Sequence, residues 1–385
     1  MRRRRSRPSR PRWRIRRRPA RALTIPSGPE APAPDESLVA APTTHRGLTY
    51  PFGRFAPEHG AFARVAEGVG WSRLPVPGSL GHINIWMLDD GDGVALVDTG
   101  LAIDEARAAW AALLDGPLAG RPMTRIIVTH FHPDHVGLAG WLCERTGARL
   151  WMTRGEWTYA RMLAADVRDA PPDEAVALWR AAGWDETRIA AEAARGWGRF
   201  ASIVSPIPVS YGRLADGDEV RIGTRDWRVV IGSGHSPEHA CLVDMEGRLM
   251  IAGDQVLPRI TSNVSLNLSE PEADPLGEWL ASIAKLRELP ADLLVLPAHG
   301  QPFTGLHARL DALDAGHRDR LDALYGAIAE PKRAVDCFGT LFARRIDDGS
   351  FGLASGEALA HLRRLEVEGR AIREVRDGVW WFRAA

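Results

Sequence analysis

Cysteine is scarce in this chain, and long apolar runs are missing from it. Its three cysteines, Cys143, Cys241 and Cys337, are scattered and odd in number. This pattern argues against a disulfide framework and is typical of reduced thiols in a cytoplasmic protein. No apolar stretch approaches the roughly 18 residues that a membrane span needs, so we expect no membrane partner. The Arg-rich start has no apolar segment behind it, which argues against a secretion signal.

The chain also has no net charge, because 49 basic residues balance 49 acidic ones. The charges are nevertheless unevenly distributed. Residues 1–21 contain 12 arginines and no acid, which leaves 37 basic against 49 acidic residues in the rest of the chain. An acidic body argues against a long nucleic-acid track, which needs Lys and Arg clustered on one face. We therefore expect a small-molecule substrate, with nucleic acid as a less favoured partner.

Residues 1–49 are rich in Arg, Pro, Ala and Ser and show no hydrophobic periodicity. This composition predicts a disordered tail. One interpretation is an arm that binds polyanions. The other is a solvated tail, or upstream DNA translated from a start codon placed too early, and we favour this second interpretation.

The most informative feature is the run Thr129-His130-Phe131-His132-Pro133-Asp134-His135, which directly follows an apolar segment. It packs three imidazoles and one carboxylate into six residues, and these are ligands that Zn²⁺ and related divalent ions prefer. In a turn after a strand, the side chains of His130 and His132 converge while Asp134 and His135 face a neighbouring point. The run therefore predicts two adjacent metal positions, rather than a His-rich surface loop.

Three later segments repeat one arrangement, in which a short apolar run stops at Gly or Pro and then presents one ligand-type residue. The residues presented are His235, Asp254 and His299. Rigid scaffolds commonly present functional residues in the turns that follow strands. We expect these three side chains to complete the set begun by the first motif.

This pattern resembles the metallo-β-lactamase-fold hydrolase superfamily, whose signature is His-x-His-x-Asp-His followed by a later His, Asp and His. The resemblance covers roughly residues 59–301. It implies a first metal site held by His130, His132 and His235, and a second metal site held by Asp134, His135 and His299. The carboxylate of Asp254 would bridge the two. An aspartate at the bridging position resembles the glyoxalase-II, lactonase and ribonuclease-Z branches, whereas true β-lactamases carry Cys or Ser there.

The resemblance also assigns roles around the ligands. Asp98, in a segment that resembles the strand and turn before the metal motif, would accept the second N–H of a ligand imidazole. An ordinary turn residue is the alternative for Asp98. We interpret His239 as a supporting or structural residue, because the ligand sets are already full.

Two divalent ions that share one water lower its pKa from about 15.7 to about 7, so hydroxide forms at neutral pH. We therefore expect a dinuclear metal-dependent hydrolase that uses a metal-bridging hydroxide, with Asp254 and Asp134 as catalytic carboxylates. Asp254 would set the metal separation, and Asp134 would orient the hydroxide. Zn²⁺ is the expected metal, although the same ligands accept Fe or Mn. A mononuclear iron oxygenase, or a metal-bound protein that binds a ligand without turnover, is the non-hydrolytic alternative.

The similarity to glyoxalase-II-like enzymes implies an acyl thioester or ester as substrate. Phosphodiesters of RNA and lactones are the alternatives. We do not recognise the basic residues that bind glutathione in glyoxalase II. Tyr211, Arg259 and Asn263 are candidate substrate-binding residues, and Arg259 could pair with a carboxylate or phosphate.

Alternating strand-like and helical segments predict a layered α/β domain over residues 50–305, and the resemblance implies an αββα sandwich. Residues 156–200 favour helix and predict a helical insertion. This insertion would either form a lid over the pocket or pack against the core through its aromatic residues. Residues 306–330 form the expected connecting helix.

Residues 331–385 predict two helices and then a hairpin around Asp377-Gly378. This order resembles a winged-helix module that some members of the superfamily carry. Its second helix mixes Glu and Arg without a clean basic face. We therefore favour packing or homodimer formation over nucleic-acid docking for this segment.

Overall fold

The computed structural model describes residues 41–385. Most of the expected tail, residues 1–40, lies outside these described residues. The end of that tail was wrongly predicted, because β1 (Thr43–His45) and β2 (Leu48–Tyr50) form an antiparallel hairpin. Leu48 and Tyr50 are buried with Phe303 in one hydrophobic cluster. A distant packing partner therefore orders a segment whose composition alone indicated disorder.

The first of two large sheets has seven strands in sequential order. Its first four strands are antiparallel, whereas the pairings from β6 to β9 are parallel. The strands are β3 (Ala63–Ala66), β4 (Val69–Val76), β5 (Gly81–Asp90), β6 (Gly93–Val97), β7 (Met123–Ile127), β8 (Arg149–Thr153) and β9 (Gly212–Leu214).

The second sheet has five strands, also in sequential order, and only its last pairing, between β13 and β14, is parallel. The strands are β10 (Glu219–Ile222), β11 (Arg225–Gly232), β12 (His239–Asp244), β13 (Leu249–Gly253) and β14 (Leu294–Pro297). Because β11 and β13 are both antiparallel to β12, the strands β11, β13 and β14 all end at the same edge of the sheet.

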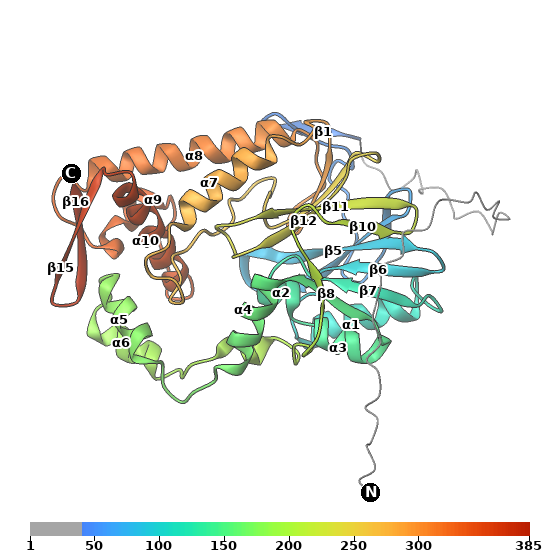
Figure 1. The fold of residues 1–385 in the computed structure, drawn as a ribbon, viewed down its shortest axis with the longest axis horizontal. Coiled ribbons are helices and arrows are strands. Elements are labelled where there is room, and N and C mark those ends of the chain that lie inside the picture. Colours follow the sequence, from blue (N-terminus) through green and yellow to red (C-terminus); the bar gives the residue numbers. More distant parts are fainter. Residues whose placement is uncertain (1–40) are drawn as a thin grey trace, which may run out of the picture. The chain divides into compact units, whose positions relative to one another are not determined.

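The two sheets face each other (Figure 1). The buried layer between them includes Trp71, Trp86 and Trp227. Strand residues alternate between this layer and the helical layer outside, as strand geometry requires. Along β7, for example, Ile126 faces the outer helices and Ile127 faces the other sheet. The helices that pack in the outer layer of the seven-stranded sheet are α1 (Asp104–Asp115), α3 (Ala139–Thr146) and α4 (Arg154–Ala165).

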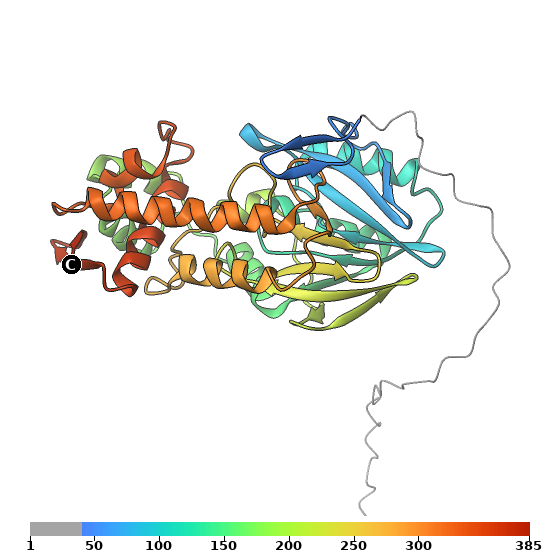
Figure 2. The same cartoon turned by 90° about the horizontal axis from the view of Figure 1, so that it is seen from above.

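The five-stranded sheet is covered by α7 (Pro275–Leu286) and α8 (Leu306–Ala327), which run side by side (Figure 2). Helices therefore cover both outer faces, and the expected αββα sandwich is confirmed. Two short elements lie near the site: η2 (Gly78–Leu80) and α2 (Pro133–Val136). Within residues 41–385, no helix combines the length and apolar character needed to cross a membrane.

The helical insertion divides into two parts with different packing partners. Its first helix, α4, packs on the seven-stranded sheet through Ala160. The later elements are α5 (Asp173–Ala181), α6 (Glu186–Ala193) and η3 (Arg199–Ile203). Around α5 and α6, Trp184 packs with the C-terminal segment and donates a hydrogen bond to Ser355 at 2.8 Å. Part of the insertion is thus attached to the C-terminal segment rather than to the sheets, and its role as a lid stays a prediction.

The C-terminal segment has the predicted order of helices followed by a hairpin. It consists of η4 (Ala334–Cys337), α9 (Phe338–Leu341), α10 (Phe351–Val367), β15 (Ala371–Arg376) and β16 (Val379–Ala384). Asp377 and Gly378 have φ of 52° and 78°, which is the backbone of a two-residue type I′ turn. Helix α10 packs against α7 and α8, and its apolar residues belong to the same cluster as theirs.

Candidate metal centre

Sheet topology brings the ligand-type residues together. In the second sheet, His235, Asp254 and His299 follow the ends of β11, β13 and β14, which share one edge. In the first sheet, Asp98 and His130 follow the parallel strands β6 and β7. The backbone N–H of Ala240 donates to the carbonyl of Thr129 at 2.9 Å and joins the two edges. Residues far apart in the chain therefore meet at one end of the sandwich.

The first group of potential ligands consists of His130, His132, His235 and Asp254. Nε2 of His130 lies 2.8 Å from Nδ1 of His132 and 3.2 Å from Nε2 of His235. His130 is fully buried, and burial lowers its pKa well below the usual value. A neutral imidazole offers the nitrogen lone pair that a divalent ion needs. The geometry and the charge state of this group both suit a metal ion.

The second group consists of Asp134, His135 and His299. Oδ2 of Asp134 lies 3.3 Å from Nε2 of His299 and 3.7 Å from Nε2 of His135. Burial by itself would raise the pKa of the Asp134 carboxyl, but His135 and His299 lower it to about 2. The carboxylate is therefore ionised at neutral pH and provides an anionic oxygen beside two imidazoles.

Asp254 lies between the two groups, and its carboxylate oxygens face different ways. Oδ2 is 3.4 Å from Nε2 of His235, in the first group. Oδ1 is 3.4 Å from Nε2 of His299 and 3.6 Å from Nε2 of His135, in the second. One carboxylate thus reaches both groups, which is the arrangement that the sequence suggested for a bridging ligand.

Three buried atoms of the centre have no hydrogen-bond partner among the described residues: Nε2 of His135, Nε2 of His299 and Oδ1 of Asp254. Buried polar atoms are normally paired, because an unpaired one loses the hydrogen bonds that it made to water. Oδ1 of Asp254 lies 3.6 Å from Nε2 of His135 and 3.4 Å from Nε2 of His299. A divalent cation would satisfy all three at once, so the residues present fit a bound metal.

Supporting contacts fix the imidazole rings. The carboxylate of Asp98 accepts from Nδ1 of His135 at 2.8 Å and from the backbone N–H of Thr129 at 2.8 Å. The first contact holds the His135 tautomer that leaves Nε2 free for a metal. Asp98 has a φ of 66°, a strained backbone for a residue other than glycine, and it is buried. Such strain persists where surrounding contacts over-determine the conformation.

Two more rings are oriented by backbone carbonyls. Nδ1 of His235 donates to the carbonyl of Asn263, and Nδ1 of His299 donates to the carbonyl of His82, both at 2.7 Å. His239 acts differently, because its Nε2 accepts the backbone N–H of Asp254 at 3.0 Å. His239 therefore lies outside both ligand groups, and its hydrogen bond fixes the backbone that carries the Asp254 carboxylate.

Glu156 is a supporting residue that the sequence did not reveal. It is fully buried, and its oxygens accept from the N–H of Phe131 at 2.8 Å and from the hydroxyl of Ser236 and the N–H of Glu238 at 2.7 Å each. Burial raises its pKa to about 7 despite these donors. The carboxyl ties the loop of His130 to the loop of His235. Its place just after a strand end was the only available signal.

The three candidate substrate-binding residues have different surroundings. Arg259 lines a cavity together with His299, beside the second ligand group. Asn263 acts through its carbonyl on His235, so its observed contact is with a ligand ring. Tyr211 stacks on Trp157 at 4.5 Å in the outer helical layer. Of the three, Arg259 has the position that suits substrate binding, in the wall of a cavity beside the ligand groups.

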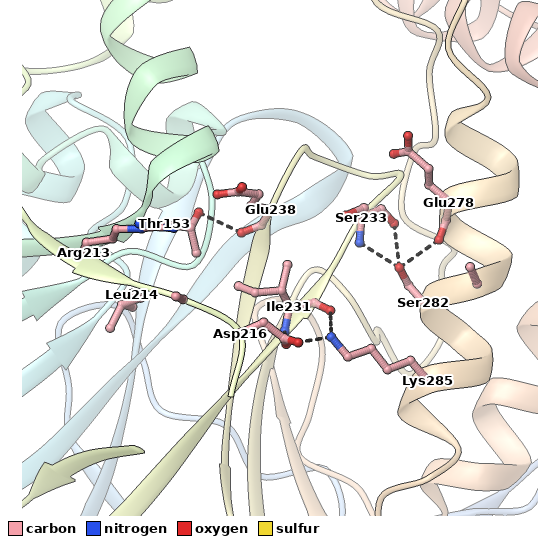
Figure 3. A pocket seen from close by; sticks show the side chains of 12 residues that line it. Thr153, Arg213, Leu214, Asp216, Ile231, Ser233, Glu238, Glu278, Ser282 and Lys285 are labelled. Atoms are coloured by element: carbon pink, nitrogen blue, oxygen red, sulfur yellow. Dashed lines mark hydrogen bonds and ion pairs between the residues drawn. The ribbon is translucent and has the colours of Figure 1, made fainter. Parts of the chain in front are cut away.

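A cavity of about 510 Å³ lies behind the loop that carries His235, between that loop and α7 (Figure 3). The hydroxyl of Ser282 on α7 accepts from the N–H of Ser233 at 2.7 Å and donates to the carbonyl of Glu278 at 2.8 Å. Nearby, Lys285 donates to Asp216 at 2.6 Å. The contact of Ser282 attaches the His235 loop to α7, whereas that of Lys285 attaches α7 to the turn between β9 and β10. None of the seven potential ligands lines this cavity.

Comparison with known proteins agrees with this geometry. Residues 78–299 match the model of the metallo-beta-lactamase superfamily, and residues 321–385 match a metallo-beta-lactamase-like C-terminal domain. The chain belongs to the metallo-β-lactamase superfamily. Within it, the chain is a metal-dependent hydrolase, and its histidine and aspartate groups fit the divalent metals that the superfamily binds.

A crystal structure of a beta-lactamase domain protein from Burkholderia ambifaria is 40% identical, covering 88% of this chain and 98% of that one with a TM-score of 0.81. The probable metallo-hydrolase YqjP of Bacillus subtilis is 24% identical, over a match that spans 79% of this chain and 94% of the length of YqjP.

Two functionally named relatives match over shorter stretches. A hydroxyacylglutathione hydrolase of Cereibacter sphaeroides is 26% identical over 54% of this chain and 63% of its own. An atrochrysone carboxyl ACP thioesterase of Emericella nidulans is 25% identical over 59% of this chain and 54% of its own. For both relatives, the match leaves more than a third of their own length uncovered.

Proposed function

We propose that this protein is a dinuclear metal-dependent hydrolase that cleaves an acyl thioester or ester. The observation that carries the proposal is the position of Asp254, whose two oxygens face the two ligand groups separately. If Asp254 served a single metal ion, the second group of potential ligands on its other side would have no metal to bind.

In this proposal three groups of residues hold the metals. His130, His132 and His235 would hold the first ion, Asp134, His135 and His299 would hold the second, and Asp254 would serve both. Divalent ions in such a pair make a bound water acidic enough to ionise near neutral pH and polarise the bond under attack. Zinc is the proposed metal, because its borderline character suits imidazole and carboxylate, with iron or manganese as substitutes.

The protein's own groups position the reaction. Asp254 sets the spacing of the two ligand groups, and His239 holds its backbone at 3.0 Å. Asp134 is ionised, so its carboxylate can accept a hydrogen bond from the attacking water and orient it. Hydrolysis adds the water's hydroxyl to the acyl carbon as the carbon–sulfur bond breaks, and the water's proton goes to the leaving thiolate, which becomes the free thiol.

The names of two relatives support an acyl thioester as the substrate, and the ion pairs of α10 argue against RNA docking on that helix. One relative is named as a thioesterase and another as a hydrolase of an acylated glutathione. In addition, α10 pairs its arginines with acids, for example Arg363 with Glu366 at 2.7 Å and Arg364 with Glu368 at 2.9 Å. Paired arginines form no open basic face for a phosphodiester backbone.

A panel of an acyl thioester, a lactone and an RNA phosphodiester tests the proposal on the metal-loaded protein. We expect turnover of the thioester to exceed that of the other two, and Asp254→Asn to reduce it by about 100-fold or more, since the electrostatic contribution is typically several kcal/mol. An RNA substrate that is cleaved faster than any thioester would overturn the assignment of the substrate class.

A further inference from the structure

Two neighbouring cavities, one of them beside the second ligand group, have basic residues and no acidic ones in their described walls. The first, of about 560 Å³, includes Arg54, Arg73, Arg259 and His299 in its wall. The second, of about 660 Å³, lies between the β1–β2 hairpin, the loop after β13 and the start of α8. Its basic wall residues are His45, Arg46, Arg54, Arg259 and Arg309. No Asp or Glu among residues 41–385 lines either cavity.

The two cavities share part of their walls. Arg54, Pro258, Arg259 and Gln301 line both, so the cavities are adjacent. Because His299 lines the first cavity, the pair extends from the metal centre toward the β1–β2 hairpin. A ligand that filled both would have one end at the ligand groups and the other against the hairpin.

The arginines of these cavities lack carboxylate partners within the described part of the chain. None of the five has an Asp or Glu oxygen within ion-pair distance, although most of the arginines that surround the C-terminal segment do. Arg309 donates instead to the carbonyls of Leu257 and Ile260, and Arg259 lies over the ring of Tyr50 at 5.6 Å. Uncompensated cations gathered in one place favour an anionic ligand.

Arg73 is the clearest case, because it is largely buried and yet has only neutral partners. It donates to the side-chain oxygen of Asn84 at 3.2 Å and to the carbonyl of Gly300 at 3.1 Å. Burial lowers its pKa to about 10. A buried cation without a counter-ion is costly unless a ligand supplies the negative charge.

We propose that the two cavities form a subsite for a thiol that carries phosphate groups, with Arg54 and Arg259 as the shared anion-binding side chains. This inference rests on the proposed thioesterase function. The thioester bond lies at the metal centre, and the phosphates of the leaving thiol lie between the arginines. Arginine suits this role because its planar fork binds phosphate through two parallel hydrogen bonds.

Phosphate is favoured over carboxylate by the size and the charge of the subsite. Five arginines match a ligand with several negative charges better than one with a single carboxylate. Cavities of about 560 and 660 Å³ also have the volume of drug-sized or nucleotide-sized ligands. The aromatic ring of Tyr50 and the peptide groups around Pro258 provide the uncharged part of the wall.

The test compares three thioesters of one acyl group on the metal-loaded protein: with coenzyme A, with glutathione and with uncharged N-acetylcysteamine. We expect the kcat/KM for the coenzyme A thioester to exceed that for the N-acetylcysteamine thioester by about tenfold or more, through KM. The double variant Arg54→Gln/Arg259→Gln should remove most of this preference, by raising KM for the coenzyme A thioester far more than KM for the N-acetylcysteamine thioester. Arg145→Gln is the matched control, because Arg145 is also exposed and lies over an aromatic ring, that of Trp141 at 5.6 Å.

A second readout does not depend on turnover. Calorimetry with adenosine 3′,5′-bisphosphate should show binding to the wild type and to Arg145→Gln that weakens at least about tenfold in the double variant. If binding weakens as expected but no thioester is hydrolysed, the subsite stands and the proposed function fails. If the wild type and every variant hydrolyse the coenzyme A and N-acetylcysteamine thioesters with the same kcat/KM, the function stands and the subsite fails. A preference for the glutathione thioester, or tighter binding of a ten-nucleotide RNA, would overturn the assignment to a phosphate-bearing thiol.

Discussion

The side-chain amide of Asn263 donates a hydrogen bond to the carboxylate of Glu357 at 3.0 Å. The carbonyl of the same Asn263 accepts from Nδ1 of His235 at 2.7 Å. Glu357 lies on α10, so two hydrogen bonds connect the C-terminal segment to a ring of the proposed metal centre. The segment therefore contributes to the geometry of the site as well as to the hydrophobic core.

Removing the Glu357 carboxylate, which accepts the hydrogen bond from Asn263, should make the His235 ring less firmly held. We expect Glu357→Leu to lower the affinity for divalent metal by about tenfold, because partners behind a ligand typically contribute 10–100-fold. Glu357→Gln keeps an acceptor oxygen and should bind metal nearly as well as the wild type. Competition with a chromophoric chelator measures both affinities. Glu366→Leu on the same helix is the control, and an equal loss in that variant would contradict a specific role for Glu357.

Asp98 offers a second test of ring orientation. We predict that Asp98→Asn lowers metal affinity by about 10–100-fold, because an amide can donate toward Nδ1 of His135 and favour the wrong tautomer. Asparagine tolerates the positive φ of this position, so the backbone should persist. Circular dichroism would verify the fold. Unchanged metal affinity in a folded variant would show that the contact at 2.8 Å has no orienting role.

His317 and His361 predict a pH dependence of stability away from the metal centre. Both are fully buried, with Nδ1 of His317 3.3 Å from Nε2 of His361. Burial, the neighbouring His361 and Arg320 together lower the pKa of His317 to about 3. Burial and Arg320 lower the pKa of His361 to about 4, although its Nδ1 donates to the backbone carbonyl of Glu357 at 2.8 Å, which opposes the shift. Because the unfolded chain takes up protons at these sites first, the free energy of unfolding should fall as the pH drops from about 6.5 toward 4.

The variant His317→Met removes one of these titrations. Between pH 7 and pH 5 we expect it to lose about 2 kcal/mol less unfolding free energy than the wild type, the contribution of one histidine with a depressed pKa. Urea denaturation at the two pH values measures the difference. His307→Met is the control, because His307 is only partly buried and lies on the same helix. Parallel losses in wild type and His317→Met would contradict the assignment.

Much of the site could be predicted from local sequence pattern. The spacing of His130, His132, Asp134 and His135 is short, so the residues have to lie close together whatever the fold. His235, Asp254 and His299 were recognisable because each follows an apolar run that becomes a strand, and the parallel relation of those strands brings the three together.

The supporting contacts could not be predicted, because they depend on tertiary packing. Glu156 lies in a helix, and nothing local indicates that its carboxyl is buried between two loops. Asn263 was expected to contact substrate, whereas its carbonyl holds His235. The β1–β2 hairpin was assigned to a disordered tail because its partner, around Phe303, lies some 250 residues later in the chain.

Metal content per chain tests the central claim most directly. Elemental analysis of the wild type should find two divalent ions per chain, and Asp254→Ala should retain at most one, because both ligand groups lose a shared carboxylate. The measurement needs no substrate and so does not depend on the proposed thioester. A wild-type content of one ion per chain or less, after incubation with excess metal, would contradict the dinuclear centre.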